Sequence, residues 1–157
     1  MSLFYYCLLI AGIVAADQIT KFLVVQNIPL YADVQAIPGL FHLTYVQNTG
    51  AAFSSMDGMR WVFVAVFVVL TVLLLVEYFK LKLPFRPFER WCIVAIYGGG
   101  LGNVIDRIFL GYVVDMIEVD FMRFAVFNVA DIFITCGCIA LIISLFFNKE
   151  FWKEDKK

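Results

Sequence analysis

The stretch that decides the fold covers residues 61–79 and reads WVFVAVFVVLTVLLLVEYF, with Glu77 as its one charged side chain. A membrane-spanning helix needs about 20 mostly apolar residues, and this stretch meets that requirement. Three further segments also meet it, and they cover residues 3–25, 91–109 and 124–147. The sequence therefore predicts four transmembrane helices.

The composition of the whole chain agrees with this prediction. The 157 residues are 63% hydrophobic and 16% charged, whereas a soluble domain is about 45–50% apolar and about 25% charged. The mean hydropathy is +0.90. The first apolar segment lacks the basic residues that begin a cleaved signal peptide, so we expect it to remain as a helix. We therefore expect a single integral membrane domain over residues 1–157 and exclude intrinsic disorder.

The distribution of lysine and arginine predicts which side of the membrane each loop faces. Eight basic residues lie between the second and third segments or after the fourth, and four lie in the other two loops. Because cytoplasmic loops are enriched in Lys and Arg, we expect the middle loop and both termini to be cytoplasmic. Residues 26–58 and 111–123 then face outward.

The outward segments carry patterns of their own. Residues 41–46 alternate in a way typical of a strand, and the small, turn-prone residues 48–52 follow. Residues 112–121 are amphipathic and can form a short helix or an extended stretch at the membrane surface. The predicted fold class is an all-α membrane protein with four transmembrane helices, a small extracytoplasmic β-sheet and a short interfacial helix.

The charge and the cysteines exclude several classes of function. The net charge is −1, from 12 basic and 13 acidic residues, and no basic patch indicates a nucleic-acid partner. Cys136 and Cys138 lack the spacing of a zinc site, and we interpret all four cysteines as small buried apolar residues. With His42 as the one histidine, no zinc cluster is available, and we interpret His42 as structural or exposed.

Four aspartates lie where an ionised side chain is costly. Asp17 and Asp106 lie near the outer ends of the first and third segments, Asp131 lies inside the fourth, and Asp115 directly follows the third. A charged side chain at the centre of a spanning helix costs roughly 2.5–3.5 kcal/mol on insertion scales, so each is a functional hypothesis by default. All four converge on the outward side, although the orientation was assigned from basic residues alone.

Two of these aspartates have basic residues close by in the sequence. Lys21 follows Asp17 by four positions, on the same helical face. Arg107 adjoins Asp106, and Asn103 lies one turn earlier. We interpret these residues as polar clamps that hold helix ends together.

Asp115 and Asp131 are different, because neither has a basic residue within one turn in the sequence. Asn128 lies one turn before Asp131 and can hydrogen-bond to it. Two carboxylates in a poorly solvated site share one proton, so one can accept a proton from water while the other donates to a carbonyl under attack. This is the chemistry of aspartic proteases, but positions 115 and 131 can meet only if the fold brings them together.

The residues alone leave two other classes of function open. A small transporter also uses membrane carboxylates, although here they cluster on one side and do not thread the bilayer. A non-catalytic assembly subunit would use the glycines of residues 98–102 as helix contacts. That glycine run is not a phosphate loop, because no strand precedes it and no Lys-Ser/Thr pair follows it, so we interpret it as packing.

Five short motifs occur along the chain: DQITK at 17–21, NTGAAFS at 48–54, GNVIDR at 102–107, GYVVD at 111–115 and FNVAD at 127–131. Taken together, these motifs resemble the prolipoprotein signal peptidase family, also called signal peptidase II. The resemblance covers nearly the whole chain, with the motifs in the family's order and spacing. Met116 stands where the family usually has an aromatic residue, and Ala125 stands where a proline is common.

The resemblance implies an aspartic endopeptidase of the bacterial cytoplasmic (inner) membrane, with its site near the extracytoplasmic face. The implied substrate is a diacylglyceryl-modified prolipoprotein, cleaved just before the lipidated cysteine, with membrane lipid as the surrounding partner. Asp115 and Asp131 match the catalytic dyad, and no cofactor or metal is implied. A monomer is the expected state. The positions that match site-shaping residues are Asp17, Lys21, Asn48, Gly102, Asn103, Asp106, Arg107, Asn128 and Ala130, with Asn48 and Arg107 as expected substrate contacts.

Overall fold

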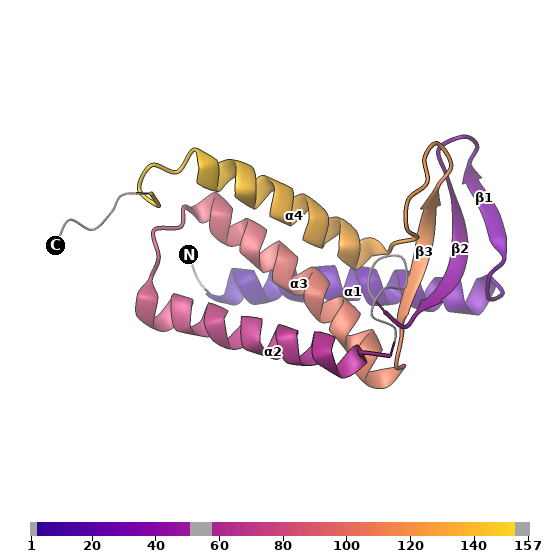
Figure 1. Ribbon diagram of the computed structural model, residues 1–157, viewed down its shortest axis with the longest axis horizontal. Coiled ribbons are helices and arrows are strands. Elements are labelled where there is room, and N and C mark those ends of the chain that lie inside the picture. Colours follow the sequence, from indigo (N-terminus) through magenta and orange to yellow (C-terminus); the bar gives the residue numbers. More distant parts are fainter. Residues whose placement is uncertain (1–2, 51–57, 153–157) are drawn as a thin grey trace.

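Four helices and a three-stranded antiparallel sheet build the protein (Figure 1). The structure is a computed structural model, and it describes residues 3–50 and 58–152. The helices lie side by side, and the sheet projects beyond one end of the bundle. In chain order the elements are α1 (Leu3–Asn27), β1 (Asp33–Ile37), β2 (Phe41–Asn48), α2 (Arg60–Val76), the π-helical continuation η2 (Glu77–Leu81), α3 (Pro87–Phe109), β3 (Val113–Val119) and α4 (Val129–Phe146).

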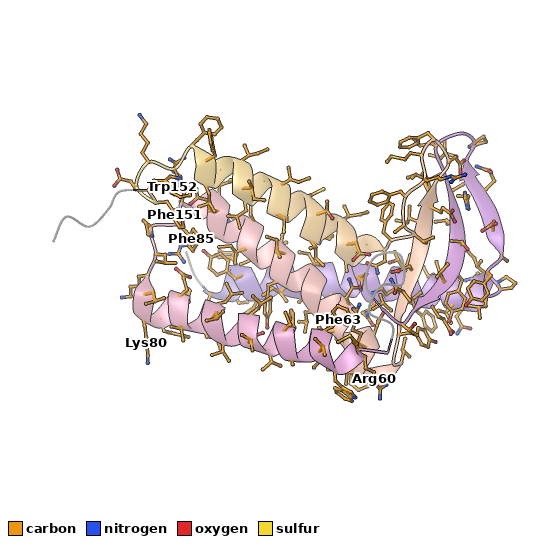
Figure 2. All side chains as sticks on the ribbon, viewed as in Figure 1. Arg60, Phe63, Lys80, Phe85, Phe151 and Trp152 are labelled. Atoms are coloured by element: carbon orange, nitrogen blue, oxygen red, sulfur yellow. The ribbon has the colours of Figure 1, made fainter. Side chains whose placement is uncertain are left out.

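The four predicted spans are confirmed as helices that are long and apolar enough to cross a membrane. The helix formed by α2 and η2 is the most apolar, and only 6% of its span is buried inside the protein. A helix that is apolar on all sides and yet unburied faces lipid. At the bundle end away from the sheet, Phe85 stacks on Phe151 and Trp152 packs beside them, which suits the aromatic belt at a membrane surface (Figure 2).

Two helices, α3 and α4, begin at residues other than the predicted ones. α3 begins at Pro87, four residues before the predicted start, because proline suits the first turn of a helix. α4 begins at Val129 and not at 124, because the Asn128 side chain accepts a hydrogen bond from the backbone N–H of Asp131 and caps the helix there. The backbone of Phe127 instead pairs with Ile117 of β3.

The sheet corrects the predicted fold class. The alternation at residues 41–46 is confirmed as part of β2, which lies between β1 and β3. The short interfacial helix expected within residues 112–121 is wrong, because residues 113–119 form β3. This segment is rich in β-branched residues, which favour strands, and its backbone pairs with β2 from Val113 to Val119. The protein is therefore not all-α.

Glycines allow α3 to pack closely against α1 and α4. A Cβ atom on Gly99 would lie 2.5 Å from the carbonyl oxygen of Ala130, and one on Gly102 would lie 2.6 Å from an Asp17 carboxylate oxygen. Real Cβ atoms almost never come this close to another atom, so a side chain at either position would force the α4 backbone or the Asp17 carboxylate to shift. The interpretation of residues 98–102 as a packing motif is confirmed, and the packing brings α1, α3 and α4 together near the sheet.

A small apolar core joins the end of α1 to the sheet. It contains Val24 and Ile28 from the α1 end, Tyr45 from β2, and Val114 and Met116 from β3. Met116 therefore fills a buried position at the point where the family usually has an aromatic residue. This core holds β3, and with it Asp115, against the end of the helical bundle.

The interpretation of the cysteines as buried residues is correct for one of them. Cys92 is buried, Cys138 is half-buried, and Cys7 and Cys136 are exposed. The apolar surroundings in the sequence reflect positions on the outside of spanning helices as well as positions in the core, because a helix in lipid carries apolar side chains on both faces.

Candidate active site

A buried ionic cluster lies where α1 and α3 meet near the sheet. The ammonium group of Lys21 lies 2.8 Å from Asp17 Oδ2 and 2.9 Å from Asp106 Oδ2, and it donates to Asn103 Oδ1 at 2.9 Å. Lys21 is 3% exposed, and both carboxylates are buried. The predicted Asp17–Lys21 pair is confirmed, and Lys21 also neutralises the second carboxylate.

Arg107 does not pair with Asp106, although the two are adjacent in the sequence. Successive helical residues point in different directions, so Asp106 faces α1 while Arg107 faces away from it. The Arg107 guanidinium donates to the carbonyl oxygen of Gly50 at 2.8 Å and lies over the Phe63 ring, 4.5 Å from its centroid. Arg107 therefore fastens the chain after β2 to the start of α2.

Gln18 belongs to this cluster and was not among the predicted site residues. Its side-chain amide donates to Asp106 Oδ1 at 2.8 Å and makes longer contacts, both at 3.3 Å, with Asp17 Oδ2 and the Gly102 carbonyl. The sequence signal for Gln18 is its place three residues before Lys21, on a neighbouring part of the same helix. The amide satisfies lone pairs that Lys21 leaves free.

The two acids of the ionic cluster also hold the backbone beside Asp115 and Asp131. Asp106 Oδ2 accepts a hydrogen bond at 3.1 Å from the backbone N–H of Val114, the residue before Asp115. Asp17 Oδ1 accepts one at 2.9 Å from the backbone N–H of Ala130, the residue before Asp131. The cluster thus positions both remaining aspartates through their neighbours in the chain.

Asp115 is a buried carboxylate held by two side-chain amides. Asn48 donates to its Oδ2 at 2.8 Å, and Asn128 donates to its Oδ1 at 2.7 Å. Asp115 is 2% exposed. Burial is the largest influence on this group, and it raises the pKa of Asp115 from 3.8 to about 6, while the hydrogen bond from Asn48 lowers it.

Asp131 lies in the first turn of α4 and also accepts two hydrogen bonds. Asn103 donates to its Oδ1 at 2.8 Å, and the backbone N–H of Asn128 donates to its Oδ2 at 3.1 Å. The predicted contact between Asn128 and Asp131 is therefore present. The side-chain amide of Asn128 also donates to Asn103 Oδ1 at 3.0 Å. Asn128 thus contacts both aspartates at once.

Asp115 and Asp131 open onto one cavity of about 450 Å³. Its polar part also includes Asn48, Asn103 and Arg107. Its apolar part consists of Val113, residues 124–127 and α4 residues Ile132, Thr135 and Cys136. Two carboxylates at the polar end of an otherwise apolar hollow can act on a peptide bond whose neighbours are apolar.

Each site residue predicted from the sequence lies at this end of the bundle. Gly102 and Ala130 contribute close backbone packing, and the seven polar residues other than Asp115 and Asp131 contribute ion pairs or hydrogen bonds. Residues 51–54 of the second motif lie outside the described residues.

Known proteins that resemble this chain point to one family. The family model of signal peptidase (SPase) II matches residues 9–147. The lipoprotein signal peptidase of Streptococcus pyogenes serotype M2 is 43% identical over 143 residues, which are 91% of this chain and 90% of that relative. The lipoprotein signal peptidase of Streptococcus thermophilus (strain CNRZ 1066) is 43% identical over 150 residues, covering 93% and 91%.

A solved structure described as a bacterial membrane enzyme is 28% identical to this chain. It superposes with a TM-score of 0.87 and covers 99% of this chain and 95% of its own. A second structure with the same description gives a TM-score of 0.83 at 28% identity, covering 94% and 96%. Sequence and fold agree, and this chain therefore belongs to the signal peptidase II family.

Proposed function

We propose that Asp115 and Asp131 are the catalytic carboxylates of this enzyme. As a signal peptidase II, the enzyme is an aspartic endopeptidase that removes signal peptides from prolipoproteins. The observation that carries the proposal is that both carboxylates line one cavity and both accept hydrogen bonds from Asn128. Two acids that face each other across a shared donor in a buried site hold one proton between them.

In the proposed reaction, the ionised carboxylate takes a proton from a water molecule as the water oxygen bonds to the scissile carbonyl carbon. The protonated carboxyl gives its proton to the carbonyl oxygen, which produces a neutral diol. The C–N bond of the diol then breaks, one carboxyl protonates the departing amine, and the other takes a hydroxyl proton as the carbonyl re-forms. The pair ends with one proton, as it began.

The cavity lining supports a proposal for where the substrate is cleaved. We infer that cleavage falls just before a cysteine that carries diacylglycerol, because the lining along α4 is apolar while the carboxylates lie at the polar end. The acyl chains would remain in lipid, where each buried CH₂ contributes about 0.8 kcal/mol of attachment. Asn48 and Arg107 line the cavity and carry N–H groups that can donate to substrate carbonyls.

The remaining site residues are proposed to shape the site. Asp17 and Asp106 hold the backbone beside the two catalytic carboxylates, and Lys21 forms ion pairs with both Asp17 and Asp106. Asn103 and Asn128 orient the catalytic carboxylates. Gly102 and Ala130 permit the close approach of α1, α3 and α4.

The proposed placement is a multi-pass, monomeric protein of the bacterial cytoplasmic membrane, with residues 1–157 forming one integral membrane domain. Lys80, Lys82, Arg86 and Arg90 lie between α2 and the first turn of α3, at the end of the bundle away from the sheet. The enrichment of basic residues in cytoplasmic loops supports cytoplasmic termini and an extracytoplasmic sheet. The site would then open near the extracytoplasmic surface.

The test is cleavage of a purified diacylglyceryl prolipoprotein by the detergent-solubilised protein. Wild type, Asp115→Asn and Asp131→Asn are compared, with circular dichroism and thermal unfolding measured for each. We expect cleavage by wild type alone, with all three proteins folded. Cleavage by either variant would contradict the dyad. Loss of folding in both variants would instead support a structural role for the two aspartates.

A further inference from the structure

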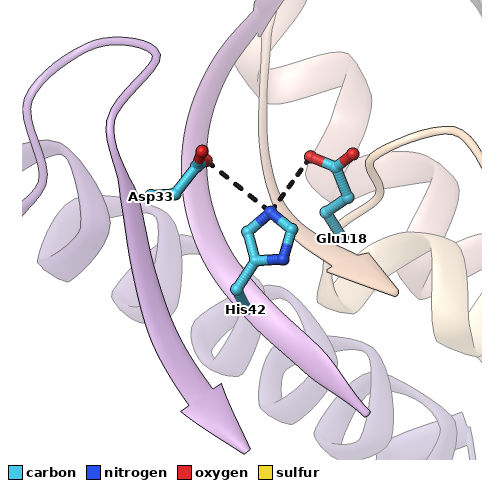
Figure 3. A group of neighbouring side chains, drawn as sticks. All are labelled: Asp33, His42 and Glu118. Atoms are coloured by element: carbon cyan, nitrogen blue, oxygen red, sulfur yellow. Dashed lines mark ion pairs between the residues drawn. The ribbon is translucent and has the colours of Figure 1, made fainter. Parts of the chain in front are cut away.

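A second cluster of ionisable side chains lies on the sheet, apart from the proposed catalytic site. It consists of Asp33 on β1, His42 on β2 and Glu118 on β3 (Figure 3). The strand register explains why they meet: His42 lies opposite Glu118, and Asp33 lies opposite Thr44, two residues from His42 and on the same face. Each of the three neighbouring strands therefore contributes one side chain to the same small cluster.

The three possible ligand atoms lie within 4.8 Å of one another, and two of the separations fit a metal site closely. His42 Nε2 lies 3.3 Å from Glu118 Oε2 and 3.6 Å from Asp33 Oδ1. Both distances exceed the usual N–H···O hydrogen bond of about 2.7–3.2 Å. They match the edge of a tetrahedral site, which is about 3.4 Å for metal–ligand bonds of about 2.0–2.2 Å.

The other nitrogen of the imidazole is already occupied. His42 Nδ1 lies 2.7 Å from Asp120 Oδ1, so this carboxylate can accept a hydrogen bond from the Nδ1–H tautomer of the ring. Histidines that bind metals usually donate their second ring N–H to a carboxylate in this way. In the neutral imidazole, Nε2 then carries its lone pair between the Asp33 and Glu118 oxygens.

The charge around the cluster favours a cation. The strands β1, β2 and β3 contain no lysine or arginine. Arg123 lines the same surface hollow as His42, Glu118 and Asp120. The carboxylates of Asp33 and Glu118 balance the charge of a divalent ion. The positive charge of Arg123 balances the negative charge of Asp120.

We propose that Asp33, His42 and Glu118 bind a divalent transition-metal ion, of which Zn²⁺ is the best fit, with water at the fourth position. An imidazole with two carboxylates suits zinc better than magnesium or calcium, which prefer oxygen ligands alone. The ion links all three strands, and its strongest effect is to fix β1, an edge strand whose five residues are exposed. The sequence predicts no zinc cluster because it contains one histidine, whereas the proposed site takes two of its three ligands from carboxylates.

The test measures binding of Zn²⁺ to the chelator-treated, full-length protein in detergent at neutral pH. Isothermal titration calorimetry gives the affinity, metal analysis after dialysis gives the stoichiometry, and thermal unfolding gives the linked stabilisation. The variants are His42→Gln, Asp33→Asn, Glu118→His and Asp120→Asn. The control is Glu150→Gln, which removes one negative charge near the C-terminus. Mg²⁺ is titrated in parallel.

We expect one Zn²⁺ per wild-type chain, a rise in Tm with zinc, and weaker binding of Mg²⁺. Affinity for Zn²⁺ should fall at least about tenfold in His42→Gln and Asp33→Asn, and about tenfold in Asp120→Asn, which removes the carboxylate that orients the ring. Glu118→His replaces one ligand by another and should retain binding, as should Glu150→Gln.

Two results would overturn the proposal. One is no saturable Zn²⁺ binding by folded wild type, in which case His42 serves as a protonated partner of the surrounding carboxylates. The other is zinc binding that His42→Gln and Asp33→Asn leave unchanged, which would place the ion elsewhere, for example on an exposed cysteine. Because the wild-type measurement decides the first result, the test stands even if a variant fails to fold.

Discussion

Two buried carboxylate clusters lie at opposite ends of α3, and the one near the sheet lies beside the cavity that Asp115 and Asp131 line. Glu89, in the first turn of α3, is 0% exposed and accepts hydrogen bonds from Ser144, Asn148 and the backbone N–H of Arg86. The cluster around Asp106 lies roughly 25 Å further along the helix. Glu89 links the start of α3 to the end of α4, and both of its carboxylate oxygens accept hydrogen bonds from neutral donors.

The difference shows that burial alone does not make a carboxylate catalytic. The neutral amide and hydroxyl donors around Glu89 saturate its oxygens and leave no access for a substrate. Asp115 and Asp131 also have amide donors, but both line a cavity, and their neighbours Val114 and Ala130 are held by Asp106 and Asp17. The two ends therefore use the same chemistry, one to fasten helices and the other to position reactive groups.

The largest expected effect is a loss of cleavage when a carboxylate near the sheet is replaced by an amide. The same replacement at Glu89, at the other end of α3, serves as the comparison. Asp115→Asn or Asp131→Asn should reduce prolipoprotein cleavage by about 10³-fold or more, because each removes an acid or base of the reaction. Glu89→Gln should lower stability by about 1–3 kcal/mol, because one donor would face an amide N–H. Its cleavage rate per folded molecule should be unchanged. A strong loss of turnover in folded Glu89→Gln would contradict a purely structural role for Glu89.

The next largest effect is a loss of stability when Lys21 is replaced. Lys21 is the cation of the cluster near the sheet, whereas the partners described for Glu89 are neutral. Lys21→Met should destabilise the protein by about 3–5 kcal/mol, because it leaves two buried carboxylates without a counter-ion. Thermal unfolding in detergent measures the loss. Lys80→Met is the control at the other end, where an exposed lysine should change stability by less than about 0.5 kcal/mol. Equal stability of the two variants would argue against the ionic cluster as the support of the site.

A smaller effect tests the close packing that brings the site together. Gly102→Ala would place a methyl group 2.6 Å from Asp17 Oδ2, and it should cost about 1–3 kcal/mol and lower cleavage. Gly12→Ala is the matched control in a helix, because no heavy atom lies within 4 Å of its added Cβ. That control should stabilise by about 0.5–1 kcal/mol. A tolerated Gly102→Ala would mean that α1 and α3 can separate without loss.

The smallest expected effect is the dependence of stability on pH. The pKa of Asp115 is raised from 3.8 to about 6, so the folded state holds a proton that the unfolded state has lost. The stabilising contribution of the protonated carboxyl is therefore present at low pH and is lost as pH rises through this window. We expect a fall of a few degrees in Tm. Asp115→Asn should remove this part of the pH dependence, whereas Glu89→Gln should retain it.

The sequence predicted the four spans, and it placed the expected site residues at one end of the bundle. It failed where neighbours in the sequence are not neighbours in space. Asp106 and Arg107 are adjacent, but helix geometry turns them apart, and Asp106 pairs with Lys21 from α1. The amphipathic residues 112–121 fit a helix or a strand equally well. Pairing with β2 decided the outcome, and no local pattern contains that information.

The sequence by itself determined the four apolar spans, because hydropathy and length suffice for a helix in lipid, and it determined the family, because five motifs occur in order. Only the tertiary structure decided how the polar residues divide their roles. It placed Asn128 between Asp115 and Asp131, joined Asp17 to the start of α4, and brought Asp33, His42 and Glu118 to one point. Apart from the local contact between Asn128 and Asp131, these contacts join residues from different elements of the fold. Such contacts depend on packing that local sequence patterns do not encode.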